Sequence, residues 1–146
     1  VTEADRIFRR ELEQRIEDYG IKNQIVWMGF RSDIGDILAA TDCVFVPSEE
    51  GLSLVAMEAM SAKRQVVTMN SSGAYELLNH AGCGTFYKED DELSVTNAVK
   101  KVLETPNAEA TERGYAFCRE QTNANFKKEI TNLFLNVQSS NGGLRV

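Results

Sequence analysis

Short apolar runs alternate along the chain with stretches in which apolar residues recur at helical spacing. Four of these runs are nearly continuous, and this pattern is typical of strands buried on both faces rather than on one. We place the strands at about residues 24–28, 43–47, 65–69 and 84–87. Buried strands that alternate with helices indicate a parallel sheet whose strands are joined by helical crossovers.

Helices are predicted between and after these strands. Thr2 caps the first, Asp5 stands in the capping-box position, and Gly20 ends the helix. Ser32 caps the second. The later helices are expected at about 52–62, 73–80, 93–103, 108–121 and 126–137. The fold class is therefore α/β: a doubly wound, Rossmann-like parallel sheet with helices on both faces, followed by C-terminal helices. This domain is expected to span 1–137, with a flexible tail at 138–146.

Composition narrows the function classes. The 146 residues suit one domain, and 16 basic against 22 acidic side chains give a net charge of −6, which argues against a nucleic-acid partner. No apolar run is long enough to span a membrane. The three cysteines are widely spaced and fit a reducing, cytoplasmic setting, with a peripheral place at the cytoplasmic membrane face left open. A single histidine, His80, excludes any site that needs two.

Ligands of doubly wound sheets bind at the carboxyl ends of the strands, so the segment after the second strand is a candidate site. Gly51 precedes a helix start there, where free N–H groups and the helix dipole attract an anionic phosphate. Glu50 and Glu58 lie on either side, roughly 12 Å apart at 1.5 Å per residue. A nucleotide sugar has hydroxyl-rich ends and a central diphosphate that match this spacing. Alternatively, Glu49 or Glu50 only stabilises the helix start through its dipole.

A second candidate loop follows the third strand, at Asn70-Ser71-Ser72-Gly73-Ala74-Tyr75-Glu76. Small residues at the end of a strand allow the backbone to approach a phosphate or a sugar. Taken by itself, this segment is better interpreted as an ordinary strand-to-helix turn with Ser71 or Ser72 as the cap.

Together these segments resemble the retaining group 1, or family 4, glycosyltransferases of the GT-B fold. Glu50-x7-Glu58, within Pro47-Ser-Glu-Glu-Gly-Leu-Ser-Leu-Val-Ala-Met-Glu-Ala-Met60, is similar to the signature of that family. Val26-Trp-Met-Gly-Phe30, Asp42-Cys-Val-Phe-Val-Pro-Ser48, Ser72-Gly-Ala-Tyr-Glu76 and Cys83-Gly-Thr-Phe-Tyr87 resemble its neighbouring segments in the same order. The resemblance covers roughly residues 4–137.

The resemblance implies a C-terminal, donor-binding domain that transfers a sugar from a nucleotide sugar with retention of configuration. It assigns Glu50 to the reacting sugar as the catalytic residue and Glu58 to the ribose hydroxyls. The other implied donor-binding residues lie in three loops: Gly29, Phe30 and Arg31; Gly51, Leu52 and Ser53; Ser72, Gly73 and Glu76. It implies no cofactor and no metal, and the chain holds no Asp-x-Asp motif.

The resemblance also implies partners. An acceptor glycan, lipid or small molecule would be held by an N-terminal domain that is missing here, so these residues alone are expected to transfer little sugar. The first strands of the donor domain are also missing, together with their Arg and Lys, and the exposed sheet edge is expected to favour self-association.

The sequence departs from the family pattern at three positions. Lys63 stands where the family often has Gly, Gln65 where it often has Pro, and Ser72 replaces the first Gly of its turn. Two alternatives therefore stay open: a non-catalytic nucleotide or sugar-nucleotide binding module, and a sugar-nucleotide epimerase of the same fold. A phospho-acceptor receiver domain is disfavoured because no Asp falls at the required strand ends.

Overall fold

The computed structural model describes residues 2–49, 51, 53–121, 124–125, 127–128 and 131–132, and the chain divides into two compact units, Val1–Ser32 and Asp33–Val146. The first unit contains helix α1 (Glu3–Asp18) and the short 3-10 helix η1 (Lys22–Gln24). The predicted cap of α1 is confirmed, because the Thr2 hydroxyl accepts from the Asp5 amide at 3.2 Å and the Asp5 carboxylate accepts from the Thr2 amide at 2.6 Å. Hydrogen bonds to its carboxylate from the Thr2 backbone and the Thr2 side chain lower the pKa of Asp5.

The predicted strand at 24–28 is wrong. Residues 25–28 form no strand, and Val26 is 80% exposed. Trp27, which the pattern places in the core, is 48% exposed and lies 4.9 Å below the guanidinium of Arg9. A strand requires a hydrogen-bonded neighbour. Among the described residues, no strand pairs with residues 25–28, so this apolar segment does not form a strand.

The second unit is built on a parallel sheet of three strands, β1 (Cys43–Val46), β2 (Gln65–Met69) and β3 (Thr85–Tyr87), in the order β1-β2-β3. In the register of this sheet Val44 is paired with Val66, and Thr68 is paired with Phe86. Three of the four predicted strands are thus confirmed, as is their parallel direction. Among the described residues β1 pairs only with β2, so its outer edge is open.

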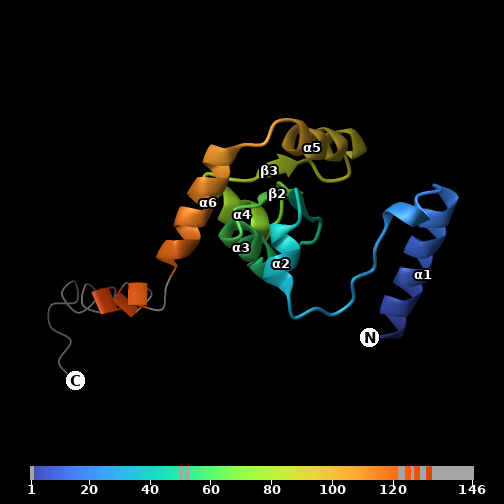
Figure 1. Cartoon of the computed structure of the whole chain (residues 1–146), viewed down its shortest axis with the longest axis horizontal. Coiled ribbons are helices and arrows are strands. Elements are labelled where there is room, and N and C mark those ends of the chain that lie inside the picture. Colours follow the sequence, from blue (N-terminus) through green and yellow to red (C-terminus); the bar gives the residue numbers. More distant parts are fainter. Residues whose placement is uncertain are drawn as a thin grey trace, which may run out of the picture. The chain divides into compact units, whose positions relative to one another are not determined.

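Among the residues described for this unit, the sheet is accompanied by five named helices (Figure 1). They are α2 (Ile34–Ala39), α3 (Leu54–Ser61), α4 (Gly73–His80), α5 (Glu92–Glu104) and α6 (Ala108–Glu120). Two starts differ from the prediction: Asp33 rather than Ser32 takes the N-cap position of α2, and α3 begins after Ser53 because that side chain caps it. The expected helix at 126–137 is helical at 127–128 and 131–132; its other positions, and the tail at 138–146, lie outside the described residues.

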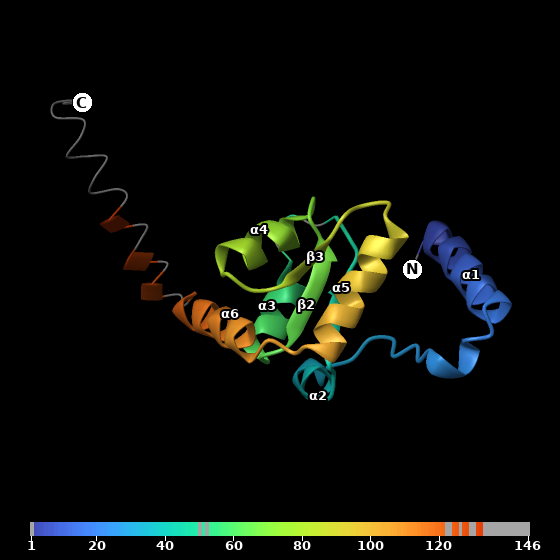
Figure 2. The same cartoon turned by 90° about the horizontal axis from the view of Figure 1, so that it is seen from above.

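The two faces of the sheet carry separate cores. Val66 of β2 packs with α3 and α4 through Met60 and Leu78, whereas Val67 packs with α5 through Val102. Figure 2 shows α5 on one side of β2 and β3, with α3 and α4 on the other. Helices therefore cover both faces, as the continuous apolar strands indicate. No helix in the described part of the chain is both long and apolar enough to cross a bilayer.

Gly84, directly before β3, is held in a conformation that other residues rarely adopt. Its φ is +92°, and a Cβ atom there would lie 3.0 Å from Leu78 Cβ and 3.2 Å from Phe86 Cε1. Leu78 is fully buried and cannot withdraw.

Replacing Gly84 by Ala is expected to lower the free energy of unfolding by about 1–3 kcal/mol, because the change adds backbone strain and a core clash. Chemical denaturation measures the loss. Gly35→Ala is the matched control: a Cβ at this helical glycine meets nothing within 4 Å, and stability should hold or rise slightly. Equal stability of the two variants would contradict the packing described for Gly84.

Candidate functional site

The candidate site lies at the carboxyl edge of the sheet, where the loops after β1, β2 and β3 leave the strands. The loop after β1 contains Gly51, at which a Cβ would meet nothing within 4 Å, so the backbone is open to a ligand. Glu50 and Leu52, the predicted catalytic residue and one of the predicted donor-binding residues, lie outside the described residues. The geometry of the site therefore comes from Gly51 and from the helix that follows it.

The start of α3 presents backbone N–H groups to this edge. Ser53 is fully buried, and its hydroxyl accepts from the Ala56 amide at 3.3 Å. The resemblance predicts that Ser53 binds the donor. The structure shows that its side chain caps α3. In an α-helix the first N–H groups have no intrahelical acceptor, so the amides of Leu54 and Val55 stay available and carry the positive end of the helix dipole.

Glu58 lies one helical turn after Leu54, about 6 Å along the axis of α3. The side chain is exposed, and among the described residues it forms no ion pair. The sequence led us to expect an acid in a largely covered helix, which would need a partner. The structure instead places this carboxylate on the open face of α3, where it can accept hydrogen bonds from a ligand.

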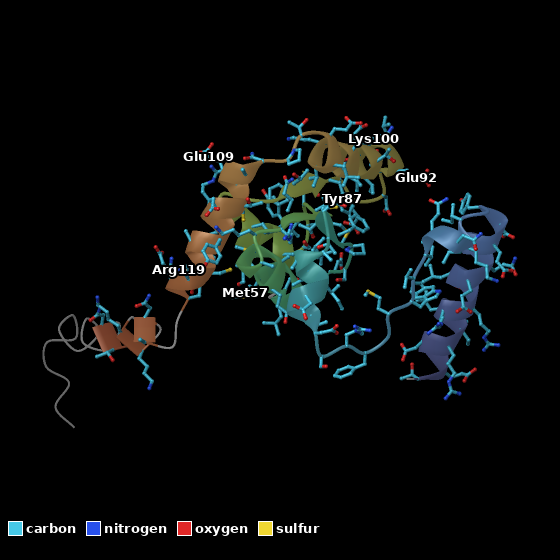
Figure 3. The ribbon with its side chains drawn as sticks, viewed as in Figure 1. Met57, Tyr87, Glu92, Lys100, Glu109 and Arg119 are labelled. Carbon is cyan, nitrogen blue, oxygen red and sulfur yellow. The ribbon has the colours of Figure 1, made fainter. Side chains whose placement is uncertain are left out.

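An apolar hollow of about 610 Å³ lies beside Glu58, between α2 and α3. We call it the α2–α3 hollow. Its lining comes from those two helices and the residue after α3: Ile34, Gly35, Leu38, Ala39, Leu54, Met57, Glu58, Ser61 and Ala62. Figure 3 labels Met57 on this part of the molecule. Pockets of this volume with apolar walls and a few polar groups are typical of small-molecule sites.

The apolar residues that line this hollow were not predicted from the sequence. Leu54, Glu58 and Ser61 stand at positions i, i+4 and i+7 of one helix, so they share a face. Leu54 is 67% exposed and Ile34 is 39% exposed. The sequence does show apolar Leu54 one turn before Glu58 on the same face of the helix. That pattern indicates a hollow only when it is also known that α2 packs against α3.

The loop after β2 contains the predicted residues Ser72, Gly73 and Glu76. Ser72 is 3% exposed and caps α4: its hydroxyl accepts from the Tyr75 amide at 3.1 Å and lies 3.0 Å from the Met69 carbonyl. The alternative of an ordinary cap is therefore confirmed for Ser72. Gly73 is half-buried and Glu76 is exposed, both in the first turn of α4.

A buried hydroxyl network ties the first two strand ends together. The Thr68 hydroxyl donates to the Val46 carbonyl of β1 at 2.9 Å and lies 3.0 Å from the Ser72 hydroxyl. On the exposed side, Ser71 donates to the Glu89 carboxylate after β3 at 3.1 Å. The three loops of the carboxyl edge are thus held in one arrangement by polar contacts that span the sheet.

Burial shifts the titration of one group at this edge, Tyr87, and of two thiols at the opposite, amino edge, Cys43 and Cys83. It raises the pKa of the Tyr87 hydroxyl at the end of β3, with a further contribution from Glu89. Burial also raises the pKa of Cys43 and brings that of Cys83 to about 11. Both thiols are therefore protonated at neutral pH and are not activated nucleophiles. Within the described residues no group of three or more His, Cys, Asp or Glu is placed to hold a metal ion.

The predicted base-facing loop belongs to the first unit. Gly29 has a φ of +62°, Phe30 is 99% exposed and Arg31 is exposed. The site described above is built from the second unit alone.

Comparison with known proteins adds to this geometry. The family model of the glycosyl transferases group 1 matches residues 8–117, which is most of the chain. The chain belongs to the group 1 glycosyltransferases. The matched range contains the open helix start, Glu58 and the α2–α3 hollow, as well as all three strands.

Two relatives illustrate the family. Human alpha-1,3/1,6-mannosyltransferase ALG2 is 27% identical over 105 residues, covering 70% of this chain and 25% of ALG2. The lipopolysaccharide glucosyltransferase WaaG of Escherichia coli K12 is 27% identical over 100 residues, covering 66% of this chain and 27% of WaaG. The chain thus spans about a quarter of the length of these curated relatives.

Solved structures show the same fold. The C-terminal domain of LpcC, a group 1 family protein from Francisella tularensis, matches with a TM-score of 0.69 and 25% identity over 82% of this chain and 65% of that domain. Anabaena Alr3699/HepE in complex with UDP-glucose matches with a TM-score of 0.71 and 25% identity over 90% of this chain and 37% of HepE. The Rossmann-like donor-domain fold implied by the resemblance is therefore confirmed.

The buried hydroxyl network allows a test of how the edge is held. Thr68→Val keeps the shape but leaves the Val46 carbonyl and the Ser72 hydroxyl short of a partner. We expect a loss of about 1–3 kcal/mol in the free energy of unfolding, measured by urea denaturation. Thr96→Val is the control, since Thr96 is exposed on α5 and bonds only to the Glu92 carbonyl; it should change stability by less than about 0.5 kcal/mol. A neutral Thr68→Val would contradict the network.

Proposed function

We propose that this chain is the donor-binding part of a glycosyltransferase that takes its sugar from a nucleotide sugar. One observation carries the proposal: the exposed carboxylate of Glu58, which forms no ion pair among the described residues, lies one turn after the open N–H groups of α3 and beside an apolar hollow. A nucleoside diphosphate presents vicinal ribose hydroxyls, a diphosphate and a flat base, and these three parts match a carboxylate, a helix start and an apolar wall.

The related structures support this assignment. HepE of Anabaena was solved with UDP and with UDP-glucose, and it shares the fold and a quarter of its aligned sequence with this chain. In our proposal Glu58 accepts hydrogen bonds from the ribose, and the amides around Gly51 and the start of α3 face the diphosphate. Gly29, Phe30 and Arg31, which belong to the first unit, stay predicted donor-binding residues. Gly73 and Glu76 contribute from the loop after β2.

Glu50 is proposed as the residue beside the transferred sugar. Transfer with retention then needs no protein nucleophile, because the leaving phosphate assists attack from the same face, and the protein supplies positioning and charge stabilisation. We propose that the reaction uses neither a metal nor a cofactor. The positive end of α3 takes over part of the charge stabilisation that a metal gives elsewhere.

The acceptor is proposed to bind mainly to a second domain, outside these residues. Closure of that domain over the donor would exclude water from the reacting sugar. We propose a cytoplasmic setting, in which the three free cysteines stay reduced.

Glu58→Gln, made in the protein that includes the acceptor domain, should weaken UDP binding about tenfold or more. The amide keeps the shape but loses charge-assisted hydrogen bonds worth about 1.5–3 kcal/mol, and each 1.4 kcal/mol is a factor of ten. Calorimetric titration with UDP measures the effect. Glu104→Gln, the same change at the exposed end of α5, should leave the affinity unchanged. Unaltered UDP affinity in the Glu58 variant would remove that residue from the site.

Glu50→Gln should lower the turnover number more than it lowers UDP affinity, because the proposed contacts are to the reacting sugar and not to the nucleotide. Steady-state rates with a nucleotide sugar, combined with the UDP titration, separate the two effects. A variant that loses affinity and turnover in proportion would instead place Glu50 at the nucleotide. A wild-type protein that binds UDP but transfers no sugar to any acceptor would support the non-catalytic binding module.

A further inference from the structure

A second cavity lies at the opposite, amino edge of the sheet. It has a volume of about 280 Å³ and is bounded by the starts of β2 and β3, the end of α5 and the start of α6. We call it the amino-edge cavity. Because the strands are parallel, it lies at the other end of the sheet from the loops of the donor site. Its volume is slightly below the range of about 300–1,000 Å³ that is typical of small-molecule pockets, so it suits a ligand smaller than a nucleotide sugar.

Arg64 lines this cavity and gives it a permanent positive charge. Its Nε atom is buried and has no hydrogen-bond partner among the described residues, and no carboxylate among them forms an ion pair with its guanidinium. A guanidinium group carries five N–H donors and no acceptor, so a ligand in the cavity that accepts hydrogen bonds would complement it.

The charges around the cavity have one sign. Arg64 and Lys101 line it, and no acidic side chain does. The acids of the first turns of α6 are engaged elsewhere: Glu109 pairs with Arg113 at 2.9 Å, and Glu112 pairs with Lys63 at 2.6 Å. The cavity is therefore electropositive and has no internal counter-ion.

The remaining polar groups of the lining are donors or fix its shape. Thr85 and Thr105 line the cavity, as does Ala108, the first residue of α6. Gln65 braces the wall: its side chain donates to the Val102 carbonyl and accepts from the Asn107 amide, both at 3.3 Å. The arrangement is thus held by contacts among three elements rather than by a mobile loop.

We propose that the amino-edge cavity binds a small oxyanion, namely a phosphate group that is either free or carried by a small molecule. Arg64 and Lys101 supply the charge, and the hydroxyls of Thr85 and Thr105 supply further hydrogen bonds. Tetrahedral phosphate has several oxygens and more than one negative charge at neutral pH, which fits two cations and several donors better than a single carboxylate does. This site is separate from the proposed donor site and does not depend on it.

The test uses the 146-residue chain with inorganic phosphate and glycerol phosphate as probes, at constant ionic strength balanced with chloride. Melting temperature and calorimetric titration report binding. We expect Arg64→Met to weaken phosphate binding about tenfold or more and to raise the melting temperature in phosphate-free buffer, since it removes a buried N–H donor that has no partner among the described residues. Lys101→Gln should weaken binding several-fold. This exposed position is expected to tolerate the change, so the test survives even if Arg64→Met does not fold.

Two control variants make the result specific. Lys100→Gln removes the same charge from the neighbouring residue of α5, which points away from the sheet (Figure 3) and does not line the cavity, so phosphate binding should persist. Glu58→Gln alters the donor site and should also leave this binding unchanged. Equal binding of the two probes supports recognition of the phosphate group alone, and preference for glycerol phosphate supports a phosphate ester. Absence of any phosphate response, or equal losses in Lys100→Gln and Lys101→Gln, would overturn the proposal.

Discussion

Strand β2 has to bury side chains on both faces of the sheet at once, and the second unit is organised around this constraint. β2 lies between β1 and β3, with Val66 in the core formed with α3 and α4, and Val67 in the core formed with α5. Neither face tolerates a polar side chain without a partner. Thr68 meets this requirement by donating to Val46 and contacting Ser72, which in turn fixes the loops at the carboxyl edge. The same strand that holds the cores together therefore positions both the candidate donor site and, at its other end, the amino-edge cavity.

Sequence patterns correctly predicted two kinds of feature. These are helix caps, which depend on neighbouring residues, and strands that pair with another strand of the described chain. The cap of α1, the cap of α4 at Ser72 and the three strands of the sheet follow from residue type and spacing. The predicted strand at 25–28 does not form for a physical reason, since a strand requires a hydrogen-bonded partner and no strand among the described residues pairs with this segment. The apolar character of a segment shows that its burial would be favourable. It does not show which other segments are available to cover it.

The candidate site was predictable from the sequence only where its residues belong to one local segment. The sequence predicts Glu58 within a helix at 52–62, and the structure places it on α3. Its contact with a ligand stays a prediction. The α2–α3 hollow is a tertiary feature, produced where Leu54 and Met57 of one helix face Ile34 of another, and no single segment contains that information. At Ser72 a local pattern allows two interpretations. The residue resembles part of a ligand-binding loop, but its hydroxyl accepts from the Tyr75 amide and donates to the Met69 carbonyl.

The turn between α3 and β2 shows how a departure from the family pattern reshapes the molecule without breaking the fold. Lys63 stands where the family often has Gly and adopts a φ of +56°, a conformation that is costly for a residue with a Cβ. Its side chain offsets part of this cost, because Nζ lies 2.6 Å from Glu112 and 4.6 Å from the ring of Tyr115, both on α6. These contacts join the turn to α6, whose first residues form one wall of the amino-edge cavity. The next residue is Arg64, whose buried Nε lacks a partner. A strained turn and a buried N–H donor without a partner among the described residues, at consecutive positions, both cost stability, and the contacts to α6 offset part of the first cost.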